Sequence, residues 1–159
     1  MHAMENKSLI IKYTLFRSLE SMNIEDASLV KEAISMLGNS YAPYSRFRVG
    51  SAVMLDDKTI VRGSNQENAA YPSGLCAERV ALFSAGANYP ERVVRKIAIA
   101  ACNESNVFQA AFPCGGCLQV LTEYEQRAKT PIRIIVFKNN DEIYVFDGVK
   151  RLLPFTFML

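Results

Sequence analysis

Apolar residues recur along the chain with two different periods, and these periods separate the expected helices from the expected strands. After Asp26, apolar side chains follow one another at intervals of three and four residues, which is typical of an amphipathic helix. The sequence places Asp26 near the N-cap of this helix and Gly38 near its end. Two later segments, residues 76–87 and 114–127, also predict helices, and Pro113 stands directly before the second.

Apolar segments of strand length alternate with these helices. We expect strands at residues 47–55, 59–63, 97–102, 132–138 and 142–147, with a turn at residues 56–58. The segment 97–102 is apolar throughout, which is typical of a strand covered on both faces. An alternation of helices with buried strands predicts the α/β class, here as a three-layer α/β/α sandwich around a mixed five-stranded sheet.

The first 25 residues carry the weakest signal. Residues 9–19 fit both an edge strand and a short helix, because their apolar spacing suits either. The chain shows no internal repeat and no linker rich in Pro, Gly or Ser. The sequence therefore predicts an N-terminal extension of unclear role at residues 1–25 and a single domain at residues 26–159.

Composition and charge exclude several classes of protein. The chain has 159 residues, of which 50% are hydrophobic and 21% are charged, and this suits one globular domain with a sizeable core. A net charge of +2 gives no electrostatic footprint for nucleic acid. The apolar runs fall far short of a membrane span of about 20 residues, and the N-terminus lacks the pattern of a secretory signal. We therefore expect a cytoplasmic protein that binds neither nucleic acid nor a membrane.

Three of the four cysteines form the most informative pattern in the chain. Cys76 stands in the CAE motif at residues 76–78, and Cys114 and Cys117 stand in the PCGGC motif at residues 113–117. Cys114 follows Cys76 by 38 residues. Thiolates three residues apart can reach one metal ion from the first turn of a helix, and Zn²⁺ binds thiolates in tetrahedral geometry. Three protein ligands leave the fourth position for water, which distinguishes a catalytic zinc site from a closed structural one.

The charges around such a site decide how strong a Lewis acid the bound metal is. Three thiolates outweigh the charge of Zn²⁺, so the metal is a poor Lewis acid unless another positive charge offsets them. Both cysteine motifs begin expected helices, whose N-termini carry partial positive charge. Arg79 follows Cys76 by three residues and is expected to hydrogen-bond a thiolate from outside the metal's own ligands. Glu78 is expected to lie beside the open position and to move a proton from water to a leaving group.

From the residues alone, other interpretations of the cysteines stay open. Cys114 and Cys117 could form a redox pair, the cysteines could be inert buried thiols, or Cys102 could close the metal shell as a fourth ligand. Cys102 ends an apolar strand, however, and fits the core better. The joint pattern of a cysteine, a glutamate two residues later and then Pro-Cys-x-x-Cys is close to the signature of zinc-dependent base deaminases.

Further segments extend this likeness over residues 41–157. They are YAPYSRFRVGSAV at residues 41–53, NQENAAY at 65–71, CAERVALF at 76–83, PCGGCLQVL at 113–121 and LLPFTF at 152–157. With these segments in this order, the chain resembles the small zinc-dependent cytidine deaminases of pyrimidine salvage. The resemblance implies their fold, one Zn²⁺ per subunit, and hydrolysis of cytidine and 2′-deoxycytidine to uridine and 2′-deoxyuridine with release of ammonia.

The resemblance also implies roles for individual residues. The zinc ligands would be Cys76, Cys114 and Cys117, with Glu78 as the catalytic proton shuttle and Arg79 beside the thiolates. The substrate-binding residues would be Phe47 on the pyrimidine ring, Asn65 and Glu67 at the ribose 3′-hydroxyl, Ala77, and Tyr71 and Phe157 across subunit boundaries. A cysteine as the first ligand points to the homotetrameric members of the family, which share active sites between subunits and act on free nucleosides.

Chemistry supports some of these roles and leaves alternatives for others. An amide and a carboxylate suit a sugar that carries hydroxyl groups, although the NQEN segment could also be a polar loop. Phe47 and Phe157 could be core aromatics, and Tyr71 could be a loop aromatic. The family often has Arg directly after its last zinc cysteine, where this chain has Leu118. This departure leaves Arg79 as the main candidate cation.

Three other functions stay open from the sequence. The first is a deaminase of an aminonucleoside antibiotic of the blasticidin type, which need not carry the NQEN segment. The second is a zinc module that binds nucleic acid or protein, which requires a closed metal shell and a basic face. The third is a polynucleotide editor, which requires clustered Arg and Lys with interleaved aromatics, and the chain has no such cluster.

Overall fold

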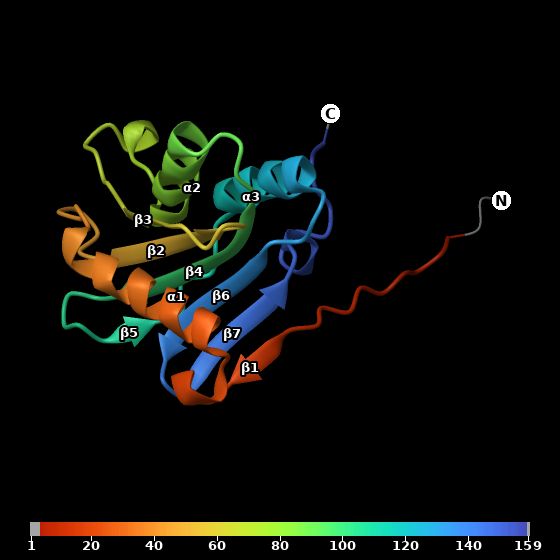
Figure 1. The fold of residues 1–159 in the computed structure, drawn as a ribbon, viewed down its shortest axis with the longest axis horizontal. Helices are drawn as coiled ribbons and strands as arrows, with labels where there is room; N and C mark the ends of the chain where they lie inside the picture. The colour runs from red at the N-terminus through yellow and green to blue at the C-terminus, as the bar shows by residue number, and fades with distance from the viewer. Residues whose placement is uncertain (1–3, 159) are drawn as a thin grey trace.

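A mixed sheet forms the middle layer of the molecule (Figure 1). The computed structural model describes residues 4–158. Its strands are β1 (Thr14–Phe16), β2 (Arg48–Leu55), β3 (Ile60–Ser64), β4 (Val94–Cys102), β5 (Phe108–Gln109), β6 (Arg133–Asn139) and β7 (Glu142–Asp147). Their spatial order is β1-β7-β6-β4-β2-β3, with β5 paired to β4. β4 and β6 run parallel, whereas the other described strand pairs are antiparallel.

The sheet has more strands than the sequence predicted. Strands β2, β3, β4, β6 and β7 correspond to the five expected ones, so the α/β class and the mixed sheet are confirmed. The expected count of five is corrected to seven by β1 and β5. These strands have only three and two residues, which is too short to produce an alternating hydrophobic pattern.

Helices cover both faces of the sheet. The α-helices are α1 (Ile24–Ser35), α2 (Ala77–Asn88) and α3 (Gly115–Ala128), and the short 3₁₀ turns are η1 (Leu19–Ser21), η2 (Met36–Asn39), η3 (Tyr71–Ser73) and η4 (Val149–Arg151). Helix α1 packs on one face, and α2 and α3 pack on the other (Figure 1). The expected three-layer α/β/α arrangement is therefore confirmed.

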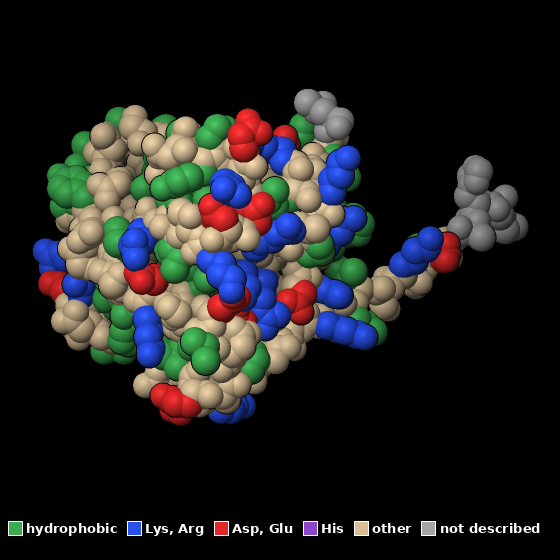
Figure 2. Space-filling model, viewed as in Figure 1, with side chains coloured by type: hydrophobic (Ala, Val, Ile, Leu, Met, Phe, Trp, Pro, Cys, Tyr) green, Lys and Arg blue, Asp and Glu red, His purple; other side chains and the backbone are tan. Residues whose placement is uncertain are grey.

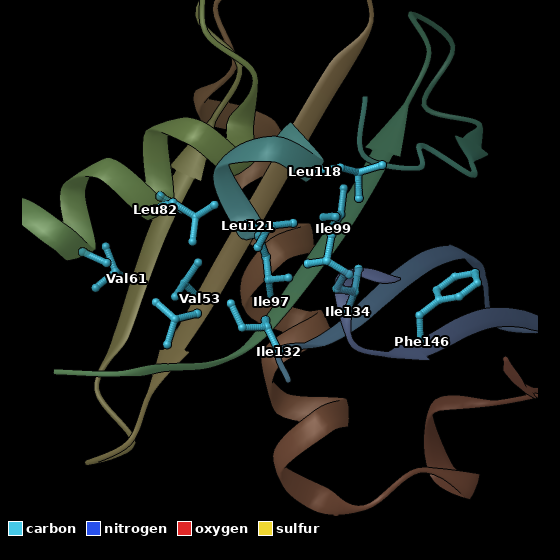
Figure 3. Close-up of a cluster of buried hydrophobic side chains, with 14 of the residues drawn as sticks. Val53, Val61, Leu82, Ile97, Ile99, Leu118, Leu121, Ile132, Ile134 and Phe146 are labelled. Atoms are coloured by element: carbon cyan, nitrogen blue, oxygen red, sulfur yellow. The ribbon is translucent and has the colours of Figure 1, made fainter. Parts of the chain in front are cut away.

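Alternation along the strands divides the core into two apolar clusters. Val53 on β2 packs toward α2 and α3, whereas its neighbour Met54 packs toward α1. Figure 3 shows Leu82 of α2 and Leu121 of α3 directed at Ile97 on β4 and its neighbours. Burial of these side chains on the sheet fixes both helices in place, since each fully buried Leu or Ile contributes roughly 1.5–3 kcal/mol relative to an exposed one.

Asn23 caps the first turn of α1, three residues before the Asp26 that the sequence places near the cap. Asn23, and not Asp26, is the N-cap, because the Asn23 side chain accepts a hydrogen bond from the Asp26 N–H at 2.9 Å. Asp26 has a completely buried side chain that binds the Lys96 Nζ at 2.7 Å and the Arg133 Nε at 2.8 Å. These ion pairs connect the first turn of α1 to β4 and β6.

The strand directions bring the starts of α2 and α3 to the same edge of the sheet. Both β3 and β4 run antiparallel to β2, which lies between them, so they are parallel to each other. Helix α2 follows β3, and helix α3 follows β4 after the two-residue strand β5, which pairs with the end of β4. Both connections therefore leave the sheet at its carboxyl-terminal edge for these strands, where open α/β sheets commonly bind ligands.

The N-terminal segment contributes an edge strand. Of the two alternatives left open for residues 9–19, the edge strand is the observed one, because β1 pairs with β7 in the register Thr14 to Val145. Ahead of β1, Tyr13 packs on β7 and residues 9–11 line a pocket with Gly148 and Lys150, whereas the N-terminal end of the described segment extends away from the body of the molecule (Figure 1). Residues 1–3 of the predicted extension lie outside the described part. Within residues 4–158, no helix is both long and apolar enough to cross a membrane.

Candidate active site

The three cysteines of the two motifs meet at one edge of the sheet. Their Sγ atoms all lie within 4.8 Å of one another, with 4.0 Å between Cys76 and Cys114 and 3.6 Å between Cys114 and Cys117. All three are free thiols, and Cys102 is buried on β4 outside this group. Sulfur ligands of a tetrahedral Zn²⁺ at about 2.3 Å from the metal lie about 3.8 Å apart. The donor set therefore fits zinc in both chemistry and spacing.

A helix begins within each cysteine motif. Cys76 is the N-cap of α2, Cys114 is the N-cap of α3, and Cys117 lies in the first turn of α3. The helices expected at residues 76–87 and 114–127 are thus confirmed to within one residue. The first N–H groups of a helix have no intrahelical acceptor, so both helices direct partial positive charge at the sulfur atoms.

Close contacts fix the two helix starts relative to the sheet and to each other. A Cβ atom on Gly63 of β3 would lie 2.6 Å from both the Ala77 carbonyl oxygen and the Ala81 nitrogen, so glycine allows α2 to approach. The Tyr124 hydroxyl on α3 donates to the Leu82 carbonyl on α2 at 2.6 Å. The relative position of the cysteines is therefore set by packing well outside the motifs themselves.

A thiolate is favoured at Cys76. The neighbouring Cys117 thiol and then the Arg79 guanidinium hydrogen-bond its sulfur, and together they lower the pKa of Cys76 to about 5. The Arg79 Nη2 lies 3.7 Å from the Cys76 Sγ. The same hydrogen bond to Cys76, together with burial, raises the pKa of Cys117. Arg79 thus occupies the position that the sequence predicts for a cation beside the thiolates.

Glu78 is a buried carboxyl group beside the cysteines. Only 5% of its surface is exposed, although its position in the first turn of α2 lines an open cavity. Burial, and then the charge of Cys76, raise the pKa of Glu78 above its ordinary value. A raised pKa makes the carboxylate a stronger base, which suits a group that takes up a proton and later releases it.

A cavity of about 620 Å³ lies beside these groups. Its volume suits a drug-sized small molecule. The expected site residues that line it are Phe47, Asn65, Glu67, Tyr71, Cys76, Ala77, Glu78, Arg79 and Cys114. Cys117 is buried beneath them, and Phe157 is the one expected substrate-binding residue that does not line the cavity.

The Asn65 side chain, directly after β3, hydrogen-bonds the backbone at the start of β2. Its side-chain Oδ1 accepts from the Val49 N–H at 2.8 Å, and its Nδ2 donates to the Phe47 carbonyl at 2.9 Å. An amide oxygen has a second lone pair and an amide nitrogen has a second proton. Asn65 can therefore hold this wall in place and still hydrogen-bond a ligand in the cavity.

Glu67 organises the loop between η2 and β2. Its Oε2 accepts from the backbone N–H groups of Tyr44 and Ser45 at 2.9 and 3.2 Å, and its Oε1 accepts from the Ser45 hydroxyl. The Ser45 hydroxyl and the backbone donors lower the pKa of Glu67. The carboxylate is therefore ionised at neutral pH and presents its remaining lone pairs at the cavity.

The three expected aromatic contacts differ in their positions. Phe47 is partly buried and lines the cavity, whereas Tyr71 is 73% exposed at the rim and meets Tyr44 edge-on at 6.1 Å between ring centroids. Phe157 is 70% exposed and is held by its backbone, because the Gln119 side chain donates to the Phe157 carbonyl at 3.0 Å. Phe157 therefore forms no part of the wall of its own chain's cavity.

Sequence reasoning missed some residues that line the cavity. Tyr44 and Ser45 lie in the YAPYSRF segment, from which sequence reasoning assigned only Phe47 to the site. Phe112 stands directly before the PCGGC motif and forms part of the wall near Cys114. A large aromatic residue adjacent to a metal motif is a signal that the sequence does contain, although by itself it does not distinguish a cavity wall from the core.

Comparison with known proteins identifies the family. Residues 23–132 match the model of the cytidine and deoxycytidylate deaminase zinc-binding region. The chain belongs to this family. A cytidine deaminase of Sporosarcina psychrophila is 35% identical over 136 residues, which cover 86% of this chain and 92% of the relative. A cytidine deaminase of Halalkalibacterium halodurans is 44% identical over 95 residues, which cover 60% of this chain and 68% of the relative.

Solved structures of the cytidine deaminase family have the same fold. The crystal structure of cytidine deaminase from Burkholderia pseudomallei has a TM-score of 0.69 and 34% identity, and the match covers 82% of this chain and 97% of that one. That of Mycobacterium tuberculosis has a TM-score of 0.61 and 29% identity, covering 86% of this chain and 100% of that one. The resemblance inferred from the sequence motifs is therefore confirmed.

Leu118 stands where the family often has Arg, and in this structure it is a core residue. Its side chain is buried in the apolar cluster under α3, close to Ile99 (Figure 3). It thus contributes to the core and brings no charge to the cysteines. Within the described residues, Arg79 is the cation that hydrogen-bonds a cysteine sulfur.

Proposed function

We propose that this protein hydrolyses cytidine and 2′-deoxycytidine to uridine and 2′-deoxyuridine and releases ammonia. The observation that carries the proposal is the position of Glu78, a buried carboxyl group beside three convergent cysteine sulfurs in the wall of a nucleoside-sized cavity. Membership of the deaminase family supports it, as do the relatives named cytidine deaminase. The protein is accordingly a hydrolase that acts on a carbon–nitrogen bond.

The proposed metal ligands are Cys76, Cys114 and Cys117, with one Zn²⁺ per chain. When bound there, zinc would acidify a water molecule toward a pKa of about 7. The two helix N-termini and Arg79 offset part of the negative charge of the thiolates. Their role in the proposal is to keep the site from becoming too electron-rich to act as a Lewis acid.

Glu78 is the proposed proton carrier. Its carboxylate accepts a proton from water and passes it to N3 of the cytosine ring while the water oxygen bonds to C4. The carboxylate then accepts the proton of the new C4 hydroxyl and delivers it to the amino group. The bond between C4 and the amino nitrogen breaks, ammonia departs, and the ring keeps a carbonyl at C4 and a proton on N3. Burial of Glu78 suits the first transfer, because it raises the carboxyl pKa in the direction of the value of about 7 expected for water on zinc.

The remaining cavity residues are proposed to orient the nucleoside. Phe47 packs on the pyrimidine ring, and Asn65 and Glu67 hydrogen-bond the ribose 3′-hydroxyl with the capacity that their backbone contacts leave free. Ala77 is the first residue of α2, so its N–H has no intrahelical acceptor and can donate to a polar edge of the substrate. These contacts hold the amino-bearing carbon near Glu78.

We also propose a homotetramer with shared active sites. Phe157 is exposed and does not line its own cavity, and Tyr71 lines the cavity while most of its surface is exposed. Both positions suit contacts with the site of another subunit. Light scattering at assay concentration should give the mass of four chains, and a monomer with full activity would contradict this part of the proposal.

The central experiment combines zinc analysis with turnover. Purified protein should contain one equivalent of zinc per chain and should cause the ultraviolet absorbance of cytidine to fall as uridine forms. The same assay with 2′-deoxycytidine and a blasticidin-type nucleoside compares the two enzyme hypotheses. Turnover of the antibiotic without turnover of cytidine would reverse the assignment, and metal-free protein with full activity would remove zinc from it.

The alternative functions have less support. The relatives reported above are named cytidine deaminases, which disfavours the antibiotic deaminase. On the face shown in Figure 2, Lys and Arg side chains are interspersed with Asp and Glu, unlike the uniform basic surface of a nucleic-acid binder. As part of this proposal, the protein acts in pyrimidine salvage in the cytoplasm.

A further inference from the structure

A cluster of aromatic rings connects the N-terminal segment to the cavity. Tyr13, which directly precedes β1, lies 5.9 Å from Tyr144 and 5.6 Å from Phe146, measured between ring centroids. Tyr144 and Phe146 in turn lie 5.3 and 6.1 Å from Phe112, and both approach its ring edge-on. These separations are typical of attractive aromatic pairs. The aromatic cluster therefore consists of Tyr13, Phe112, Tyr144 and Phe146.

The sheet explains why these rings meet. Tyr144 and Phe146 are two residues apart on β7, so their side chains leave the same face of the sheet, the one that α2 and α3 cover. The antiparallel register of β1 and β7 pairs Leu15 with Tyr144, which places Tyr13 opposite Phe146. The pairing of β1 at the sheet edge thus carries the Tyr13 ring onto the face of the molecule that holds the cysteines.

Phe112 is the member of the aromatic cluster that reaches the cavity. It lines the cavity two residues before Cys114, and 47% of its surface is exposed there. It lies in a segment without regular secondary structure between β5 and α3. Backbone hydrogen bonds of a helix or strand therefore do not hold it, and its ring packs against those of Tyr144 and Phe146.

We propose that the N-terminal segment is a positioning element of the active site, in which Tyr13 supports Tyr144 and Phe146 and thereby fixes Phe112 as a wall against the bound nucleoside. Tyr13 itself does not line the cavity, so it acts through the other rings and is a positioning residue. This inference rests on the proposed function for the identity of the ligand. It assigns to Tyr13, directly ahead of β1, a role in substrate fit that the cysteine motifs do not reveal.

A double-mutant cycle with Tyr13→Ala and Phe112→Ala tests the proposal. Loss of the Phe112 wall should raise KM for cytidine by about five-fold or more with a smaller change in kcat, since a binding contact is removed while Glu78 stays in place. Tyr13→Ala should raise KM in the same direction. The double variant should resemble Phe112→Ala alone, because residues that act through one contact give non-additive effects.

Two further variants of Tyr13 distinguish loss of its contact with Tyr144 and Phe146 from a general loss of stability. Tyr13→Phe keeps the ring and should restore the wild-type KM, whereas Tyr13→Leu keeps an apolar side chain without the ring and should behave like Tyr13→Ala. If Tyr13→Ala does not fold, Tyr13→Leu takes its place in the cycle. Tyr89→Ala is the matched control, because Tyr89 is a partly exposed tyrosine at the opposite end of α2 from Cys76 and does not line the cavity.

The outcomes distinguish this inference from the proposed function. Calorimetric titration of each variant with uridine gives a dissociation constant that does not depend on turnover, and zinc content and thermal unfolding report the state of the fold. A wild-type protein without cytidine turnover would contradict the proposed function. Unchanged KM and unchanged uridine affinity in folded Tyr13→Ala or Tyr13→Leu, or additive effects in the cycle, would overturn the positioning role.

Discussion

The Arg79 guanidinium lies one helical turn after Cys76 and donates a hydrogen bond to its sulfur at 3.7 Å. Replacing Arg79 with Gln should weaken zinc binding and lower kcat, each by about 10- to 100-fold, because a group that hydrogen-bonds a ligand tunes both the ligand and the metal. Competition with a chelator of known affinity measures the first effect, and the cytidine assay measures the second.

The control for Arg79→Gln is Arg62→Gln. Arg62 on β3 forms an ion pair with Glu32 on α1, on the other side of the sheet from the cysteines. This variant should retain zinc affinity and turnover. Equal behaviour of the two variants would show that Arg79 does not modulate the site.

Removing the acid–base function of Glu78 should separate metal binding from catalysis. Glu78→Gln keeps the size of the side chain but cannot carry a proton, so zinc content should stay near one equivalent while kcat falls by at least roughly 10²–10⁴-fold. Zinc analysis and the absorbance assay on the same sample measure both properties. Near-normal turnover in this variant would remove Glu78 from the mechanism.

A contact between Glu67 and the ribose predicts a dependence on the substrate hydroxyl. Glu67→Gln should raise KM for cytidine by about ten-fold or more, because a hydrogen bond to a charged group typically contributes about 1.5–3 kcal/mol. KM for 3′-deoxycytidine, which lacks the proposed partner, should change little. An equal rise for both nucleosides would mean that the variant only loosens Tyr44 and Ser45.

The buried ion pairs of Asp26 should make stability depend on pH. Burial opposes ionisation of Asp26, but hydrogen bonds from Lys96 and Asn23 and the charge of Arg133 outweigh it, so the pKa of this carboxyl is lowered. A lowered pKa in the folded state gives stability that is fully present above the unfolded value of about 3.9. It is lost as the pH falls through the folded-state value.

Asp26→Asn should remove this dependence together with the ion pairs. The variant should lose about 3 kcal/mol at pH 7, because two partly buried cations lose a shared partner. Urea unfolding at several pH values measures both effects: the wild-type protein should approach the stability of the variant in acid. Parallel pH profiles for the two proteins would contradict the assignment.

The sequence indicated the chemistry of the site better than its supporting structure. Cys76 and Cys114 could be placed at helix starts because their motifs precede clear helical segments, and the strands of 47–55 and 97–102 were evident from their apolar runs. Neither the capping role of Asn23 nor the pairing of β1 could be inferred, since one depends on a single hydrogen bond and the other on three residues.

Long-range packing accounts for what sequence reasoning missed at the site. Phe112 becomes a cavity wall because residues of β7 lie beneath it, and Gly63 matters because the first turn of α2 lies against it. No local pattern records either contact. The proposed roles of Phe47, Asn65, Glu67, Ala77, Tyr71 and Phe157 stay predictions for the kinetic experiments to decide.

The placement of the cysteines at helix starts also has a consequence for protein engineering. Part of the cavity wall lies ahead of those starts, in residues 65–75 and at Ala111 and Phe112, between elements that are packed on the sheet. Mutant libraries confined to these segments can therefore be screened for acceptance of unnatural pyrimidines while the hydrolytic centre keeps its framework.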